Sequence, residues 1–255
     1  MPLIFSPIEG IPIIKPHEDL GVVLIKAFER SRVSVTTGDI VVITQKIVSK
    51  SENRFRYLGD IVPSKRAAII ARKTKKDPRL VELILGESKA VVRAEEGVLI
   101  VEHKNGFICA NAGIDHSNVL EHTEKRKECY LLLPEKPDLS ANRIRRVLEE
   151  FYDAKLGVLI IDSHGRPWRK GTVGVSIGIS GFSPIADLRG KEDLYGNRLR
   201  ITQIGVADEI AAGASIVMGQ ASERVPVVHV RGYPYQLGEG KTSDLLRDEK
   251  EDLFR

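Results

Sequence analysis

Apolar and polar residues alternate most clearly in the second half of the chain. Residues 158–161 form a continuous apolar run, which is typical of a buried strand. From 173 to 180, valine and isoleucine alternate with glycine and serine, and this period of two predicts a second strand with one apolar face. A face of only glycine and serine predicts that another backbone or a flat ligand approaches it closely.

The same patterns predict a mixture of helices and strands along the rest of the chain. Helices are expected from Leu20 after the cap Asp19, at 64–76, from Pro78 to Gly86, at 141–155 after the cap Ser140, and from Thr202 to Ala211. Further strands are expected at 40–44, 90–92, 98–102, 107–110, 215–218 and 225–230. The charged tail from Lys241 is expected to be loosely ordered.

Composition limits the class of protein. The 255 residues are 42% hydrophobic, which is enough for one large domain or two intertwined lobes. No apolar run approaches the roughly 18 residues of a membrane helix, and the N-terminus does not resemble a signal peptide. The two cysteines form neither a disulfide framework nor a metal-type pair, so we expect a cytoplasmic protein. A net charge of +4 suits an anionic small molecule or nucleic acid as partner.

Polar residues follow three of the predicted strands. Residues 111–118 contain Asp115 and Asn118, the pair Asp162 and Ser163 follows the strand at 158–161, and Gln220 follows the strand at 215–218. Carboxylate, hydroxyl and amide oxygens are hard ligands that suit Mg²⁺ or Mn²⁺. The three strand ends together therefore predict a divalent-metal site.

Positive charge is available near these positions. Lys46 and Lys50 are four residues apart and share a face if the segment is a helical turn. Arg166 and Arg169 follow a turn that we expect at residues 164–165. Metal ligands, cations and glycine-rich strands predict an enzyme that holds a nucleotide triphosphate without a P-loop, because residues 238–242 lack the first glycine of that motif.

Each of these features also has a plainer interpretation. Lys46 and Lys50 fit two solvated lysines, and residues 111–118 fit an ordinary polar turn. The basic helix at 64–76 would suit nucleic acid, but no aromatic residue is interleaved for base stacking. His116 has no partner at zinc spacing and is not expected to bind a metal.

Five segments together carry a resemblance to a known family: ITQKIVSK (43–50), ANAGIDHSNV (110–119), IDSHGRPWRKG (161–171), DLRG (187–190) and VMGQ (217–220). From Pro7 to Gly232 the chain resembles the coenzyme F420-0:γ-glutamyl ligases. Members of that family use GTP to attach L-glutamate, through its α-amino group, to the carboxylate of the deazaflavin precursor F420-0, and then add further glutamates by γ-linkage.

The resemblance implies an α+β fold particular to the family, with two interleaved lobes and an intertwined homodimer. It implies one catalytic domain over 1–240, a charged tail over 241–255, and a cytoplasmic enzyme that binds neither nucleic acid nor membrane. Two divalent cations, Mg²⁺ or Mn²⁺, are implied as cofactors, and a potassium ion is left open as a further one.

Residue roles follow from the resemblance where the motifs match. Asp115 and Asp162 would hold one divalent cation, Ser163 and Gln220 would help to hold the second, and Lys50 with the two aspartates would form the catalytic set. The expected nucleotide-binding residues are Ile11, Pro12, Ile13, Ile14, Gln45, Lys46, Lys50, Asn118, Met218, Gly219, Gln220, Ala221, Ser222, Glu223, Arg224 and Val225.

The chain departs from the family pattern at several positions. Ser163 and His164 replace the usual Thr-Phe, but a hydroxyl is kept. Gln220 replaces a glutamate of some members, so the second cation would see less negative charge and would bind more weakly. Asn53 stands for a usual glycine and Asn197 for a usual arginine. The chain is too short for the extra nitroreductase-like domain of the bacterial form, which fits a stand-alone archaeal type. The alternatives are another metal-dependent, nucleotide-dependent enzyme acting on a different carboxylate, and a basic nucleic-acid-binding protein.

Overall fold

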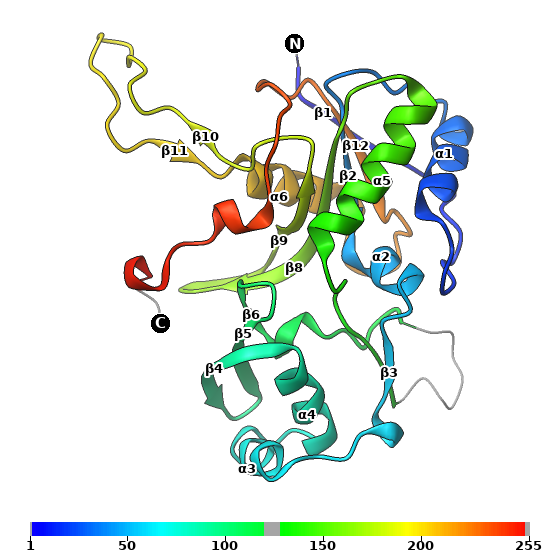
Figure 1. Ribbon diagram of the computed structural model, residues 1–255, viewed down its shortest axis with the longest axis vertical. Coiled ribbons are helices and arrows are strands. Elements are labelled where there is room, and N and C mark those ends of the chain that lie inside the picture. The colour runs from blue at the N-terminus through cyan, green and yellow to red at the C-terminus, as the bar shows by residue number, and fades with distance from the viewer. Residues whose placement is uncertain (1, 120–127, 253–255) are drawn as a thin grey trace.

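A five-stranded sheet forms the centre of the computed structural model, which describes residues 2–119 and 128–252 (Figure 1). Its strand order is β1-β12-β2-β8-β9, with β2 and β8 parallel and the other neighbours antiparallel. The strands are β1 (Ile4–Pro7), β12 (Val227–Arg231), β2 (Ile40–Thr44), β8 (Gly157–Arg166) and β9 (Arg169–Ser180). The predicted α+β class is therefore confirmed.

Helices cover both faces of this sheet. The helices α1 (Leu20–Ser31) and α5 (Pro137–Tyr152) pack on one face, and α6 (Val206–Met218) packs on the other (Figure 1). Two apolar cores result, one on each face. Because both faces are buried, β2 and the first half of β8 are continuous apolar runs rather than alternating ones.

A bulge in β9 corrects the prediction of one apolar face. Ile160 pairs with Gly178 but Ile161 pairs with Ser176, so Ile177 is an extra residue and the strand exchanges faces there. Ile177 consequently packs with α1 and α5, whereas Ile179 packs with α6.

The small residues of β9 serve close helix packing. A Cβ added at Gly174 would collide with the carbonyl oxygen of Ala211 in α6, and one added at Gly178 would lie 2.7 Å from the backbone of Pro137 in α5. The close approach that the glycines predicted is thus made by helix backbones.

A smaller body lies below the central sheet (Figure 1). Its antiparallel sheet β4-β5-β6 packs on two helices around a separate apolar core. The elements are β4 (Ser88–Glu95), β5 (Val98–His103), β6 (Ile108–Ala110), α3 (Lys65–Thr74) and α4 (Pro78–Gly86). Two further strands, β3 (Phe55–Tyr57) and β7 (Cys129–Leu131), form an antiparallel pair, and α2 (Gln45–Ser51) follows β2. Within the described ranges no helix is long and apolar enough to cross a membrane.

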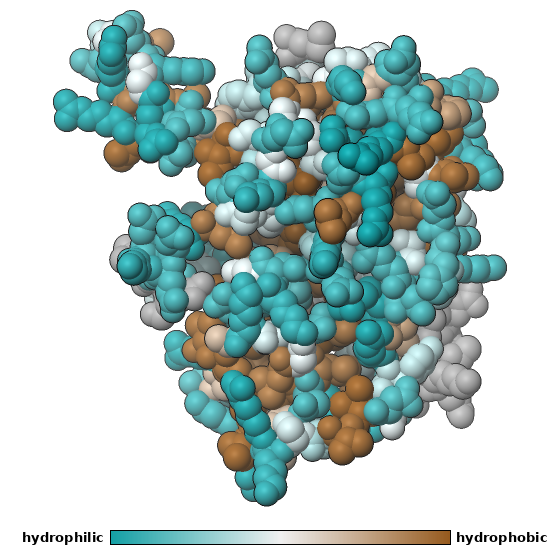
Figure 2. Space-filling model, viewed as in Figure 1, coloured by the Kyte–Doolittle hydropathy of each residue, from teal (hydrophilic) through white to brown (hydrophobic). Residues whose placement is uncertain are grey.

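An arm extends from the body between β9 and α6. It begins and ends with the short strands β10 (Ala186–Asp187) and β11 (Gln203–Ile204). Figure 2 shows it separated from the body by an open gap, with hydrophilic side chains over most of its visible surface. Leu194, Tyr195 and Ile201 on this arm are nonetheless at least 88% exposed.

Several predicted boundaries are wrong, for identifiable reasons. The strand predicted at 215–218 is the last turn of α6, which begins at Val206 rather than at Thr202, because a short apolar run does not distinguish a buried helix from a strand. The helix expected after Ser140 begins at Pro137, and β8 continues past the expected turn to Arg166. The tail is ordered at Thr242, which is buried and donates to Asp138, while residues 253–255 lie outside the described range.

A buried ion cluster lies at the start of β2. Asp39, 2% exposed, accepts hydrogen bonds from His229 Nε2 at 2.8 Å and from Arg231 Nη2 at 2.7 Å. Burial opposes ionisation, but these hydrogen bonds outweigh it and hold the pKa of Asp39 well below its usual range. The cluster therefore stabilises the fold above the ordinary carboxyl pKa, and this contribution is lost as pH falls below it.

We expect Asp39→Asn to lower the free energy of unfolding at pH 7 by about 3 kcal/mol, because it leaves His229 and Arg231 without their anion. The difference between variant and wild type should shrink towards pH 3. Urea unfolding at both pH values measures it. Asp187→Asn is the control, because Asp187 makes a comparable pair with Arg189 on the exposed arm and should show no measurable loss. Equal losses in the two variants would contradict the assignment.

Candidate active site

A cleft of about 1490 Å³ opens beyond the carboxyl ends of β2 and β8. Because these parallel strands end together, with Thr44 beside Ile161, the residues that follow each of them meet at one edge of the sheet. Nearly every residue predicted to bind metal or nucleotide lines this cleft. The lining set includes Ile11, Pro12, Ile13, Ile14, Lys46, Lys50, Asp115, Asn118, Asp162, Ser163 and every residue from Met218 to Val225.

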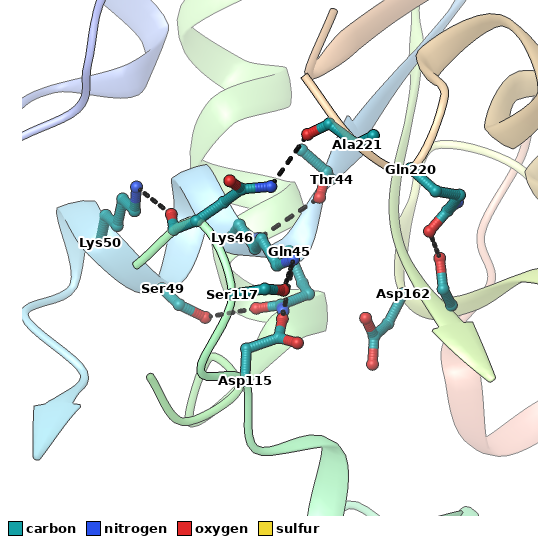
Figure 3. Close-up of polar contacts among 12 residues, drawn as sticks. Thr44, Gln45, Lys46, Ser49, Lys50, Asp115, Ser117, Asp162, Gln220 and Ala221 are labelled. Carbon is teal, nitrogen blue, oxygen red and sulfur yellow. Dashed lines mark hydrogen bonds and ion pairs between the residues drawn. The ribbon is translucent and has the colours of Figure 1, made fainter. Parts of the chain in front are cut away.

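Gln45 is the predicted site residue that does not line the cleft. It is fully buried behind Asp115, and its Nε2 donates to Asp115 Oδ2 at 2.6 Å (Figure 3). Ser49 Oγ in turn donates to Gln45 Oε1 at 2.9 Å, which fixes the orientation of the amide. Gln45 therefore positions a carboxylate from behind, a role that the sequence pattern did not reveal.

Two carboxylates and two lysines face the same space. Figure 3 shows the carboxylates of Asp115 and Asp162 pointing toward one another, with Lys46 Nζ 3.5 Å from Asp115 Oδ2. Burial raises the pKa of Asp115 to about 6, Lys46 opposes this shift, and the charge of Asp162 adds to it. Burial and the neighbouring charge of Lys46 lower the pKa of Lys50. A cation between the aspartates would favour the ionised form of Asp115, and an anion beside the lysines would favour the charged form of Lys50.

Asp162 and Ser163 lie on opposite faces of β8, because successive side chains of a strand alternate. Ile160 packs with α1 and α5, so Asp162 faces that side, whereas Ser163 follows Ile161 toward α6. Ser163 Oγ donates to Gln220 Oε1 at 2.9 Å, just beyond the end of α6.

These donors fit hard divalent cations. The oxygen groups form two sets, Asp115 with Asp162 and Ser163 with Gln220, around the end of one strand, and such oxygens are what Mg²⁺ and Mn²⁺ prefer. In the part of the chain that the structure describes, no three His, Cys, Asp or Glu side chains cluster as a metal site. Water and substrate oxygens would therefore complete the coordination, as is usual for Mg²⁺.

Hydrogen bonds connect three distant segments around the cleft. Lys50 Nζ donates to the carbonyl of Asn118 at 2.8 Å, and Asn118 Nδ2 donates to the carbonyl of Ala221 at 3.0 Å (Figure 3). The predicted phosphate lysine and the loop after α6 are thus brought together through Asn118. Lys46 Nζ also lies 3.5 Å from Ser117 Oγ, a contact that the sequence did not single out.

The other positions singled out in the sequence differ in their relation to the cleft. Arg166 and Arg169 are backbone register partners at the tip of the β8–β9 hairpin. Neither lines the cleft, so the expectation that they add positive charge to it is wrong. Asn53 lines the cleft with a positive φ of 55°, which asparagine tolerates better than most residues and which explains why glycine also suits this position. Asn197 bonds to Asp193 within the arm. His116 is exposed, with its ring against Tyr130.

The comparisons with known proteins agree on one family. Residues 10–232 match the sequence profile described as F420-0:Gamma-glutamyl ligase. A protein of Methanothermobacter thermautotrophicus named "Coenzyme F420:L-glutamate ligase" is 45% identical over 97% of each chain. Proteins of the same name are 41% identical in Methanocaldococcus jannaschii, over 96% of this chain and 94% of the relative, and in Archaeoglobus fulgidus, over 98% and 95%.

Proposed function

Because the chain belongs to the F420-0:γ-glutamyl ligase family, we propose that it is an enzyme that joins L-glutamate to F420-0 in coenzyme F420 biosynthesis, at the expense of GTP. The observation that carries the proposal is the pairing of Asp115 and Asp162 opposite Lys46 and Lys50 in one cleft beyond parallel strands. Carboxylates for a metal and lysines for phosphate are what nucleotide-driven activation of an acid requires.

The reaction has two balanced steps. A carboxylate oxygen of F420-0 attacks the γ-phosphorus of GTP, which forms an acyl phosphate and releases GDP. The amine of L-glutamate then attacks the acyl carbon, so that an amide bond forms, phosphate leaves and the amine loses a proton. Divalent cations, when bound, would neutralise the phosphate oxygens and align the reacting groups.

Different residues of the cleft would bind the cations, the phosphate and the nucleotide. Asp115, held by Gln45, and Asp162 would hold one cation, and Ser163 with Gln220 would help to hold the other. Lys50 would bind phosphate as a point charge from its half-buried position, where an anion would offset the repulsion from Lys46. The loop from Met218 to Val225 and the segment from Ile11 to Ile14 would enclose the nucleotide.

Mass spectrometry tests the function directly. The protein is mixed with F420-0, L-glutamate, Mn²⁺, potassium chloride, and either GTP or ATP. We expect a mass increase of one or more glutamyl units and release of GDP with GTP. Nucleotide hydrolysis without a mass increase would discard the substrate and favour a related enzyme that acts on another carboxylate. No turnover of either kind would contradict the proposal.

Two observations bear on partners. Lys73 and Lys75 of the basic segment form ion pairs with Glu95 and Glu96, so this face gives no support to the nucleic-acid alternative.

The exposed apolar residues of the arm, Leu194, Tyr195 and Ile201, are consistent with a homodimer in which a second copy covers them. Light scattering of the protein should give twice the chain mass.

We expect Gln220→Glu to tighten binding of the second Mn²⁺ by about tenfold, because an anionic ligand replaces a neutral amide beside Ser163. Isothermal titration with Mn²⁺ measures the two affinities. The control is Glu223→Gln, which also changes the charge of this loop by one unit. The Glu223 side chain accepts a hydrogen bond from the backbone N–H of Ala221. Unchanged affinity in Gln220→Glu would place the second cation elsewhere.

A further inference from the structure

His164 has no role in the site as assigned so far, yet it contacts one of its carboxylates. It lies two residues after Asp162 on β8, so the two side chains share a face of the strand. His164 Nε2 lies 3.0 Å from Asp162 Oδ2, and the side chains are only 11% and 14% exposed. The expected turn at this position would have separated them, whereas the continued strand holds them together.

The ring of His164 is supported from behind by an aromatic column. Its centroid lies 5.5 Å from that of Phe107, whose ring stacks on His103 at 4.9 Å with only 5° between the planes. His103 is 2% exposed, and its Nδ1 accepts a hydrogen bond from the backbone N–H of Asn105 at 3.0 Å. The column therefore connects β8 to the β5–β6 hairpin and restricts the position of the His164 imidazole.

The chemistry of the pair fixes the direction of the hydrogen bond. An ionised carboxylate only accepts, so Nε2 of His164 must carry the proton that it shares with Asp162 Oδ2. The other oxygen of Asp162, Oδ1, is not used in this contact with His164. One oxygen is thus occupied and the other is left for a different ligand.

We propose that His164 is a positioning residue that fixes Asp162 through Oδ2 and so presents Oδ1 to the divalent cation. This rests on the proposed function, in which Asp162 is a metal ligand. A carboxylate that is already oriented loses less conformational freedom when the cation binds, and partners of this kind typically change metal affinity by about 10–100-fold. Phenylalanine, the residue that the family pattern suggests here, would pack on Phe107 but has no proton to donate.

Two substitutions separate the hydrogen bond from packing. His164→Phe keeps an aromatic ring on Phe107 and removes the donor, whereas His164→Gln keeps an N–H at a similar distance from the backbone. The matched control is His116→Phe, the same change at a ring that packs on Tyr130 beside the other aspartate. Thermal unfolding in metal-free buffer checks that all three variants fold.

Mn²⁺ affinity, measured by electron paramagnetic resonance of the free ion, is the main readout. We expect His164→Phe to raise the Kd for Mn²⁺ by about tenfold or more, and His164→Gln and His116→Phe to stay close to wild type. A long-range ¹H–¹⁵N spectrum of the metal-free wild type should show a proton on Nε2 of His164, the nitrogen that faces Asp162. Unchanged Mn²⁺ affinity in His164→Phe, or an Nε2 that carries no proton, would overturn the proposal.

The outcomes also distinguish this proposal from the proposed function. If the wild type binds Mn²⁺ and His164→Phe weakens it, but F420-0 is not glutamylated, the role of His164 stands and the substrate assignment fails. If the wild type is an active ligase and His164→Phe binds Mn²⁺ normally, only the role of His164 fails. A wild type that binds no Mn²⁺ would overturn both.

Discussion

Asp162→Asn should lower kcat by about 10²–10³-fold even at saturating Mn²⁺, because a neutral amide replaces an anionic ligand where phosphate charge must be neutralised. The substitution is nearly isosteric, and the amide oxygen of the new side chain can still accept from His164 Nε2. Loss of activity would then report the charge and not the packing. Initial rates over a series of Mn²⁺ concentrations, with glutamylation followed by mass spectrometry, give the comparison.

The matched control for Asp162→Asn is Asp208→Asn. Asp208 is an aspartate of α6 that accepts a hydrogen bond from Ser176 of β9, and it does not line the cleft. It should retain most of its activity per folded molecule. Full activity of Asp162→Asn at saturating Mn²⁺ would show that the assignment of Asp162 as a metal ligand is wrong.

Asp115→Asn should have two opposite effects, a comparable loss of kcat and a gain in stability of the metal-free protein. The folded-state pKa of about 6 lies above the ordinary value of 3.8, so the folded protein favours the protonated acid. Ionising Asp115 therefore costs stability as pH rises through about 4 to 6, and the cost persists above that range. The amide removes this cost while its oxygen still accepts from Gln45.

Thermal unfolding in a chelating buffer tests the stability effect. At pH 8 we expect Asp115→Asn to be more stable than wild type by about 1–3 kcal/mol, which corresponds to a rise in Tm of about 2–10 °C. At pH 4 the difference should nearly vanish. Adding Mn²⁺ should raise the Tm of the wild type more than that of the variant. A variant that is no more stable than wild type at pH 8 would show that ionising Asp115 does not destabilise the folded protein.

The sequence predicted which residues would gather around one cleft better than it predicted the elements that carry them. Asp115 and Asp162 were recognisable because each belongs to a polar segment that follows an apolar strand. Asp162 lies on β8, beside β2, and Asp115 is held there by Gln45, the residue that follows β2. The end of α6 was mistaken for a strand because Ile216, Val217 and Met218 are apolar in succession, which hides the helical period.

Residues that act from behind the site could not be predicted. The role of Gln45 depends on a contact with Asp115, 70 positions away, and nothing in its local pattern indicates that contact. His164 resembled a turn residue because it precedes a glycine, and only the antiparallel pairing with β9 keeps it in the strand. The bulge at Ile177 was hidden for the same reason, since alternation in sequence assumes an unbroken ladder.

The clearance between β9 and α6 has a consequence for how this protein can evolve. Gly174 touches the backbone of Ala211, and the same helix ends at Met218, where the loop that carries Gln220 begins. A single methyl group at position 174 would meet Ala211 and Ser215, so it would push the second half of the helix outward and shift the loop that follows Met218 relative to Ser163. Selection on cation binding would therefore act on a residue with no functional group, because its lack of a side chain sets the spacing between the end of this helix and the strand that carries Ser163.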